Sequence, residues 1–356
     1  MSSNKIVTLE KEKYINYSEY DAHHNVYFFQ DKDSGLHGFI AIHRDNKVVP
    51  SFGATRFWQY ETEEDALHDA LRLSRGMSYK NAMAGLQYGG AKGVIIVPKG
   101  DYSKGKILKA YAKVLNEING KFITGTDVGL TQSDLFYMMK MTKFLVGSKC
   151  NPEKATATGL YYSVQEVLEF RFGSSTVSGH SFAIQGLGKV GSELLALIYD
   201  EAKEIYVADI NKEIVEKIKK EFPKVIVVDT ENIHKQDVDI YSPCALSGAL
   251  NKQTLPELKC KIIVGSANNQ LEDIGIADEL HKINIIYCPD YLVNAGGLIA
   301  VVDEYEHGDS EPVRLSERVL SIKSRLGTVL QNAKIENASP QRIADKMAEQ
   351  IVDRNK

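Results

Sequence analysis

The chain has 356 residues, of which 43% are hydrophobic and 25% charged, and its formal net charge is −4. This length exceeds what a single hydrophobic core usually organises, so we expect two domains. A weakly acidic chain has no electrostatic reason to bind nucleic acid or an anionic membrane surface, and no apolar run is long enough to span a bilayer. The N-terminal residues lack the apolar segment of a secretory signal, so a cytoplasmic protein is expected.

Cysteine and histidine usage argues against a metal centre. The four cysteines form no Cys-x-x-Cys pair, and the nine histidines include no His-x-x-x-His pair. Zinc sites need thiolates or imidazoles at such spacings. We therefore expect neither a disulfide framework nor a bound metal.

The first 150 residues predict a domain that mixes strands and helices. Residues 49–57 are small and polar enough to form a turn that presents backbone N–H groups to an anion. Apolar periodicity predicts the surrounding elements in this order: strands at 26–29 and 38–42, a helix from about residue 62 to 80, a helix at 102–118 and a strand at 121–124.

Two lysines in this half flank a glycine-rich segment. Lys80 ends the first predicted helix, and Lys92 lies in residues 89–93 (GGAKG), which we interpret as a tight turn before an apolar strand. A lysine in a dry pocket or beside another cation loses its proton more easily and can act as a base. Such a pair could bind an anionic substrate with one ammonium group and remove a proton with the other, although two surface lysines beside a loop would have the same sequence.

Asp127 follows a predicted strand and lies between turn-forming residues. Functional side chains of α/β folds are often found at such positions. The same position suits an Asx-turn or the N-cap of a helix that begins near Thr131. The local sequence leaves both roles open.

The second half has the pattern of a dinucleotide-binding domain. A predicted strand at 181–185 leads into a Gly-x-Gly-x-x-Gly turn, a helix, and a strand at 204–208 that ends at Asp209. The glycines permit the close approach of a pyrophosphate at the helix N-terminus, unless they serve packing alone. An acid after the second strand accepts hydrogen bonds from ribose hydroxyls and disfavours a 2′-phosphate, so NAD is expected rather than NADP. The expected contacts are Gly186, Leu187, Gly188, Lys189, Val190, Gly191, Asp209 and Ile210.

Further strands are expected at 225–228, 238–241, 261–264 and 284–287. Ligands bind at the carboxyl ends of strands in parallel sheets. Cys244 and Ala245 follow the second of these strands and are expected near the cofactor. Asn268 follows the third, and it could hold a carboxamide or belong to a buried amide network.

With these segments the chain resembles the amino acid dehydrogenases of the glutamate/leucine/phenylalanine/valine family, from about Gly38 to the C-terminus. The resemblance is carried by GMSYK (76–80), GGAK (89–92), GTDVG (125–129), the dinucleotide turn, GSANNQ (265–270) and PDYLVNAGG (289–297). It implies an α/β chain with an N-terminal substrate domain at 1–150, a Rossmann-type domain at 151–329 and a cleft between them. It also implies that C-terminal helices at 330–356 pack back on the first domain, and that the protein is a homo-oligomer.

The resemblance implies a role for each matching residue. Lys80 would bind the substrate carboxylate, Lys92 would activate the water that attacks the imino carbon, and Asp127 would hold the amino group and shuttle protons. The implied reaction oxidises an L-amino acid with NAD and water to a 2-oxo acid, ammonia and NADH. Positions that match the family's substrate contacts are Phe52, Gly53, Ala54, Met77, Gly125, Leu292 and Asn294, and those near the nicotinamide are Thr156 and Asn268.

The side chain of the substrate is expected to be apolar, because Phe52 replaces the lysine of the glutamate-specific branch. Gly125 and Leu292 resemble the phenylalanine-specific branch, and a glycine at 125 makes room for a ring. We therefore expect phenylalanine, with leucine, valine or tryptophan as alternatives because Phe52 could shrink the pocket again. A catalytically inactive NAD(H)-binding regulatory protein is the alternative of another class, and the retention of both lysines and the aspartate argues against it.

Overall fold

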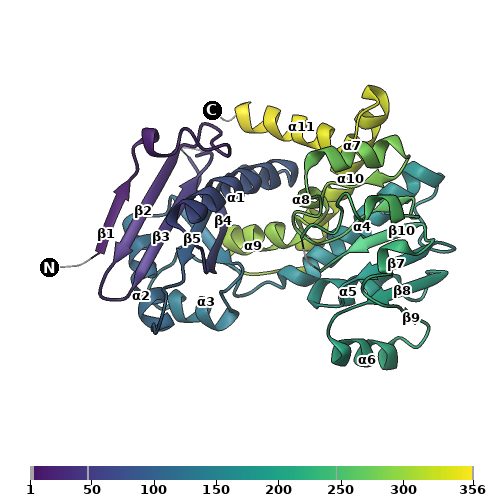
Figure 1. Ribbon diagram of the computed structural model, residues 1–356, viewed down its shortest axis with the longest axis horizontal. Coiled ribbons are helices and arrows are strands. Elements are labelled where there is room, and N and C mark those ends of the chain that lie inside the picture. The colour runs from purple at the N-terminus through teal and green to yellow at the C-terminus, as the bar shows by residue number, and fades with distance from the viewer. Residues whose placement is uncertain (1–3, 46–47, 246, 355–356) are drawn as a thin grey trace. The chain divides into compact units, whose positions relative to one another are not determined.

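The computed structural model describes residues 4–45, 48–245 and 247–354, which form two compact units (Figure 1). Unit 1 contains the described residues up to Cys150, the segment Glu304–Asp309 and the described residues from Ala348 onward. Unit 2 contains Asn151–Asp303 and Ser310–Met347. Among the described residues, no helix is both long and apolar enough to cross a membrane.

Unit 1 is built on a six-stranded mixed sheet. Its strands in spatial order are β1 (Asn4–Thr8), β2 (Asn25–Asp31), β3 (Leu36–Ile42), β5 (Gly89–Ile96), β4 (Ser51–Trp58) and β6 (Phe122–Thr126). The first four of these are joined in antiparallel pairs, whereas β4 lies parallel to both β5 and β6. The predicted strands β2, β3 and β6 are confirmed, while β1 was not predicted.

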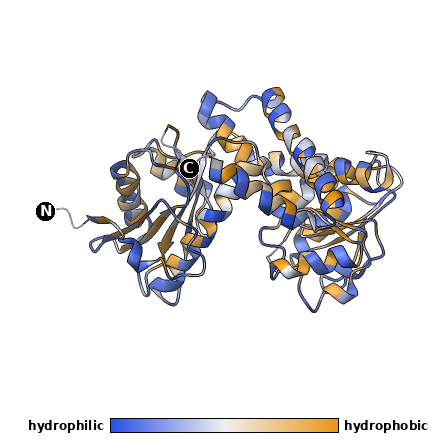
Figure 2. Ribbon diagram, turned by 90° about the horizontal axis from the view of Figure 1, so that it is seen from above, coloured by the Kyte–Doolittle hydropathy of each residue, from blue (hydrophilic) through white to orange (hydrophobic). Residues whose placement is uncertain are grey.

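Helices cover both faces of this sheet. α1 (Glu63–Met83) packs on one face, and α2 (Lys104–Glu117) packs on the other. Strand side chains alternate between the faces, so Phe39 lies in the core under α1 and its neighbour Ile40 lies in the core under α2. Figure 2 shows the result: hydrophobic strands are flanked by helices that carry both hydrophobic and hydrophilic residues.

Two segments that the sequence predicts as turns are strands instead. Residues 49–57 and 89–93 form most of β4 and the first part of β5. Their glycines serve close packing, because a Cβ on Gly53 would lie 1.8 Å from the Ala91 carbonyl oxygen and one on Gly90 would lie 2.0 Å from the backbone of α1. Glycine marks close backbone approach as well as turns, which is why both predictions were wrong.

Unit 2 contains a six-stranded sheet in which all strands are parallel. The strands in spatial order are β12 (Ile286–Tyr287), β11 (Ile262–Ile263), β10 (Ile240–Pro243), β7 (Ser181–Gln185), β8 (Glu204–Ala208) and β9 (Ile226–Val227). The chain adds strands on one side of β7, as β8 and β9, and then on its other side, from β10 onward. The glycine turn after β7 therefore lies where the direction of strand addition changes, which is where such sheets bind ligands.

In the described part of the chain, one of the remaining helices lies in unit 1, one precedes the parallel sheet, and seven come between its strands or after them. In chain order they are α3 (Gln132–Met139, in unit 1), α4 (Pro152–Phe172), α5 (Lys189–Ile198), α6 (Lys212–Glu221), α7 (Ile274–Lys282), α8 (Asp290–Val293), α9 (Gly296–His307), α10 (Pro312–Glu336) and α11 (Pro340–Arg354). The chain is therefore an α/β protein with a mixed sheet in unit 1 and a Rossmann-type parallel sheet in unit 2, as predicted.

The C-terminal helices are divided between the two units. The sequence predicts that the helices at 330–356 pack back on the first domain, and in the structure residues 330–347 belong to unit 2. Arg342 of α11 forms an ion pair with Asp278 of α7, which attaches this part of α11 to unit 2. Only the described residues from Ala348 onward belong to unit 1, and residues 355 and 356 lie outside the described part.

Candidate active site

Lys92 and Asp127 form an ion pair in unit 1. Lys92 lies in the middle of β5, and its Nζ donates a hydrogen bond to Asp127 Oδ2 at 2.6 Å. The lysine side chain is 6% exposed and the aspartate side chain 21%. Thr131 is the N-cap of α3, so the capping role that the sequence left open for Asp127 is excluded.

The backbone around Asp127 continues the pairing of β4 with β6. The Asp127 N–H donates to the Thr55 carbonyl at 3.1 Å, and the Phe57 N–H donates to the Val128 carbonyl at 2.9 Å. Gly129 has a φ of +82°, and a Cβ there would lie 1.8 Å from the Phe57 carbonyl oxygen. The aspartate is thus placed by main-chain hydrogen bonds that need a glycine two residues later.

A second cation, Arg56, contacts the same carboxylate and was not predicted. Its Nε donates to Asp127 Oδ2 at 3.1 Å, and its Nη1 donates to Asp69 Oδ2 at 2.8 Å. The available signal was strand periodicity, because Arg56 lies two residues after Ala54 on the same face of β4. Nothing local shows that Asp69 of α1 meets this strand.

The charges of this group oppose one another. Burial lowers the pKa of Lys92. The Asp127 carboxylate raises this pKa, and the positive charge of Arg56 lowers it further. Burial alone would raise the pKa of Asp127, but Lys92 and Arg56 outweigh it and hold the pKa well below its usual range. The structure therefore presents an ionised aspartate beside a buried lysine that loses its proton more readily than a lysine in water.

The neighbouring strands place small residues around Lys92. Ala54 of β4 is paired with Lys92 on one side and with Gly125 of β6 on the other, so these three positions share a sheet face. A Cβ on Gly125 would meet only the Val146 carbonyl oxygen, at an ordinary 3.5 Å. Position 53 faces the opposite side of the sheet from Lys92. Of the two predicted substrate contacts Gly53 and Ala54, only Ala54 therefore lies beside the lysine.

The C-terminal half of α1 carries Met77 and Lys80, both half-buried. This half is joined to β5 by side chains, since Ser78 Oγ accepts from the Gly90 N–H at 3.0 Å and Asn81 Nδ2 donates to the Gly89 carbonyl at 3.0 Å. The helix that carries Lys80 is therefore bonded to the strand that carries Lys92.

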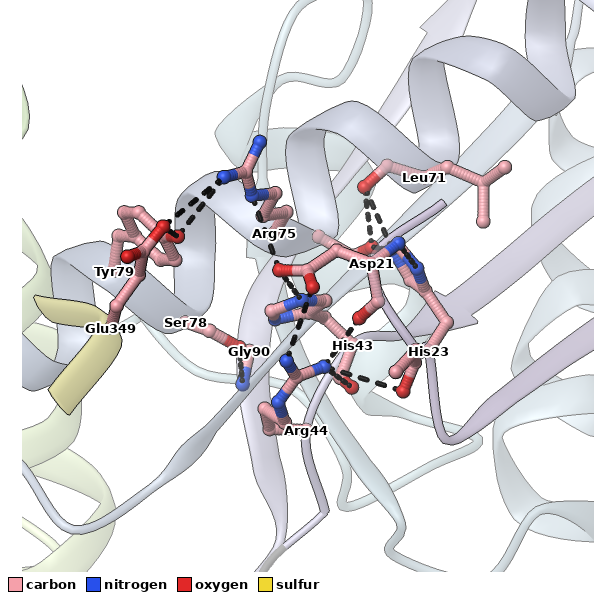
Figure 3. Close-up of polar contacts among 12 residues, drawn as sticks. Asp21, His23, His43, Arg44, Leu71, Arg75, Ser78, Tyr79, Gly90 and Glu349 are labelled. Atoms are coloured by element: carbon pink, nitrogen blue, oxygen red, sulfur yellow. Dashed lines mark hydrogen bonds and ion pairs between the residues drawn. The ribbon is translucent and has the colours of Figure 1, made fainter. Parts of the chain in front are cut away.

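The end of α1 is also held by the C-terminal segment of unit 1, as Figure 3 shows. Tyr79 donates to Glu349 Oε1 at 3.0 Å, and Arg75 donates to the Tyr79 hydroxyl at 3.0 Å. The Arg75 Nε lies 3.3 Å from Asp21, next to the buried His43. These contacts fix the helix turn that precedes Lys80.

Phe52 is completely buried in an aromatic cluster. Its ring centroid lies 4.6 Å from that of Tyr88 and 5.1 Å from that of Tyr305 on α9. The Tyr88 hydroxyl donates to Glu306 Oε1 at 2.8 Å, which fixes one wall of the cluster. Phe52 and Ala54 share a sheet face, so this immobilised ring lies on the same side as Lys92.

In unit 2, the predicted dinucleotide turn joins β7 to α5. Gly186 has a φ of +96°, and a Cβ there would lie 2.8 Å from the Cβ of Ala245. A Cβ on Gly191 would lie 2.0 Å from the Gly186 carbonyl oxygen and 3.4 Å from Cys244, whereas one on Gly188, the N-cap of α5, would meet no atom within 4 Å. The turn thus has one open glycine at a helix N-terminus, which fits a pyrophosphate.

Asp209 lies at the end of β8 and contacts the same turn. Its Oδ2 accepts from the Leu187 N–H at 2.7 Å and its Oδ1 from the Asn211 N–H at 2.8 Å. A carboxylate offers about four acceptor positions, so both oxygens can also receive ribose hydroxyls. The next side chain, Ile210, is 86% exposed. These residues fit the adenosine half of a dinucleotide.

The other predicted residues of unit 2 form smaller groups. Asn294 Nδ2 donates to Asn268 Oδ1 at 2.9 Å, which brings two predicted amides together. Thr156 donates to the Pro152 carbonyl within α4, and Leu292 is fully buried. At the glycine turn, the half-buried Val190 follows Lys189, whose Nζ pairs with Glu153 at 2.6 Å.

Within the described ranges, no group of three or more histidine, cysteine, aspartate or glutamate side chains could hold a metal ion.

Two family models match the chain. The Glu/Leu/Phe/Val dehydrogenase dimerisation domain matches residues 23–144, and the model named Glutamate/Leucine/Phenylalanine/Valine dehydrogenase matches residues 147–218 and 207–333. Leucine dehydrogenase from Geobacillus stearothermophilus is 40% identical over 354 residues, which cover 97% of this chain and 94% of that protein. Phenylalanine dehydrogenase from Lysinibacillus sphaericus is 39% identical over 309 residues, which cover 83% of this chain and 80% of that protein.

One solved structure is similar at the level of both sequence and fold. The crystal structure of L-tryptophan dehydrogenase from Nostoc punctiforme matches with a TM-score of 0.83 and 37% identity, covering 94% of this chain and 96% of that one.

Proposed function

Because this chain belongs to the glutamate/leucine/phenylalanine/valine dehydrogenase family, we propose that it oxidatively deaminates an aliphatic L-amino acid, leucine or valine, with NAD. The reaction consumes the amino acid, NAD⁺ and water, and releases the 2-oxo acid, ammonium, NADH and a proton; it is reversible. The observation that carries the proposal is the ion pair between the buried Lys92 and the half-buried Asp127, with an N–O distance of 2.6 Å.

Three side chains of unit 1 divide the work in this proposal. Lys80 binds the substrate carboxylate. Lys92, which burial and a neighbouring cation favour in its neutral form, takes a proton from the water that attacks the imino carbon. Asp127 stays ionised, holds the substrate ammonium group and passes protons between that group and Lys92.

The dinucleotide is assigned to unit 2. When bound, it supplies the hydride acceptor for the oxidation. The turn from Gly186 to Gly191 holds the pyrophosphate, and Asp209 accepts the ribose hydroxyls and selects NAD over NADP. Thr156 and Asn268 are proposed to contact the nicotinamide end.

The substrate assignment departs from the phenylalanine that the sequence predicted. Phe52 is held without exposure by Tyr88 and Tyr305, so a ring already occupies the sheet face beside Lys92. Sequence identity to leucine dehydrogenase from Geobacillus stearothermophilus, at 40%, is also slightly higher than identity to the phenylalanine dehydrogenases from Lysinibacillus sphaericus and Bacillus thermotolerans, at 39% and 37%. Phenylalanine is the second candidate, because the missing side chain at Gly125 leaves space on that face.

The unit that carries Lys92 matches a dimerisation domain, so we propose a homo-oligomer. The cytoplasmic location stays a prediction. The alternative to an enzyme is a regulatory protein that binds NAD(H) without catalysis. Such a function does not explain why an ionised aspartate lies against a buried lysine.

The proposal is tested by measuring NADH formation at alkaline pH across the twenty L-amino acids, with NADP in parallel. We expect turnover with leucine and valine and a preference for NAD. A preference for phenylalanine would mean that the space at Gly125 outweighs Phe52. Absence of turnover with every amino acid, despite NADH binding, would favour the regulatory protein.

A further inference from the structure

Two cations converge on one oxygen of Asp127. Lys92 Nζ lies 2.6 Å from Asp127 Oδ2, and Arg56 Nε lies 3.1 Å from the same atom. The proposed reaction gives Lys92 and Asp127 their roles but leaves Arg56 without one. The arginine side chain is 21% exposed, so the protein bears the desolvation cost of a second positive charge beside the first.

Arg56 is itself held from the opposite side by α1. Its Nη1 donates to Asp69 Oδ2 at 2.8 Å. Asp69 is fixed in turn, because its Oδ2 accepts from the Tyr60 hydroxyl at 2.6 Å and its Oδ1 accepts from Arg72 Nη2 at 2.8 Å. A guanidinium group that spans two anchored carboxylates has little freedom to rotate, since its donors form a rigid planar fork.

We infer that Arg56, held by Asp69, is a positioning residue that fixes the Asp127 carboxylate against Lys92 and biases Lys92 toward its neutral form. The inference rests on the proposed function, because it assigns Arg56 a part in the same proton transfer. Arg56 needs no contact with substrate for this, and its effect passes through Asp127 and Lys92.

The charge of Arg56 changes the pKa of Lys92 in a definite direction. The charged groups that face Lys92 are Asp127 from the loop after β6, Arg56 from β4 and Asp69 from α1. Burial lowers the pKa of Lys92 most; Asp127 raises it, Arg56 lowers it, and Asp69 raises it. Removing Arg56 alone therefore raises the pKa of Lys92, so a smaller fraction of the lysine is neutral at a given pH.

The experiment is the pH profile of kcat with saturating L-leucine and NAD, for the wild type and three variants. For Arg56→Gln we expect the ascending limb to move up by about one pH unit, with a roughly tenfold loss of kcat at neutral pH that alkaline pH partly restores. Arg56→Lys keeps the positive charge but loses the planar guanidinium group that contacts both carboxylates. The ascending limb of its pH profile should therefore stay near the wild-type pH, while kcat falls. Arg72→Gln is the matched control for charge, because Arg72 contacts Asp69 but not Asp127 or Lys92. Its ascending limb should not move, even if a less firmly held Asp69 lowers kcat.

An Arg56→Gln limb at the wild-type pH would overturn the inference, as would an equal shift in Arg72→Gln. If Arg56→Gln does not fold by circular dichroism, Arg56→Lys decides: a reduced kcat with an unmoved limb supports the inference, and an unchanged kcat overturns it. A wild type that oxidises no amino acid would overturn the proposed function and this inference together, whereas an active wild type with an unmoved Arg56→Gln limb overturns the inference alone.

Discussion

The neighbours of Phe52 decide whether its ring reduces the space available to a substrate. A phenylalanine beside a binding face can swing away and leave space, but this ring is packed between Tyr88 and Tyr305 and has no exposed surface. Gly125 acts in the opposite direction, because a missing side chain on the same face opens space. The sequence supplies both residues, but only the structure shows that the phenylalanine is fully buried between two tyrosines.

Shortening this ring should change substrate choice. For Phe52→Leu we expect kcat/KM for phenylalanine to rise roughly tenfold relative to that for leucine, since even one methylene group more or less in an apolar pocket changes specificity by about tenfold or more. The matched control is Phe122→Leu, a fully buried phenylalanine of β6 on the opposite sheet face. Both variants should lose stability, on the order of 1–2 kcal/mol, but only Phe52→Leu should change the ratio. An equal change in both variants would assign it to general loosening of the sheet.

At the scale of elements, α9 is divided between the two units, and its unit 1 part binds the backbone of residues 147–150, where the chain first leaves unit 1. Glu304 on this helix is 6% exposed. Its Oε1 accepts from the backbone N–H groups of Gly147 and Ser148, and its Oε2 from those of Lys149 and Cys150, at 2.9 to 3.2 Å. One carboxylate thereby satisfies four consecutive backbone donors, a contact that no local motif predicts.

This carboxylate should stabilise the fold in a pH-dependent way. Burial alone would raise the pKa of Glu304, but the N–H donors of Lys149, Ser148 and Cys150 outweigh it and lower the pKa. A lowered folded-state pKa means that the stabilisation is complete above the unfolded-state pKa of about 4.3 and is lost as the pH falls through the folded-state value. Glu304→Gln should therefore reduce the free energy of unfolding by about 2 kcal/mol at pH 7, and by progressively less below about pH 4.3.

Urea unfolding at pH 7, 5 and 3 measures this difference. Glu117→Gln, the same change at an exposed position of α2, is the control and should have little effect at any of these pH values. A Glu304→Gln effect that does not depend on pH would show that side-chain shape, and not the charge, holds the segment.

At the scale of the whole molecule, the sequence predicts best what is encoded in consecutive residues. The strand–turn–helix–strand unit from Ser181 to Asp209 follows the prediction because each part has its own local signal, and β7 and β8 have their predicted bounds. The start of α1 also depends on a local signal, because the Thr62 side chain accepts from the backbone N–H of Asp65 in a capping box.

The sequence predicts least where distant segments meet. The Arg56–Asp69 contact joins β4 to α1, and the Phe52 cluster joins β4 to α9, so neither has a sequence signature. The glycines of β4 and β5 were misinterpreted because the residues they accommodate lie on other elements. Lys92 and Asp127 are hydrogen-bonded to each other, but the sequence did not predict the second cation, Arg56, that contacts the same carboxylate.

The measurement that tests the account most directly is the release of ammonium and NADH from L-leucine and NAD in one sample, for the wild type and for Lys92→Ala. The wild type should release the two products in equal amounts. Lys92→Ala should lose at least about a hundredfold in rate while still binding NADH, because the proposed nucleotide-binding residues lie in unit 2. Lys113→Ala, an exposed lysine of α2, should behave as the wild type. NADH without ammonium, or near-normal turnover in Lys92→Ala, would contradict the proposed chemistry.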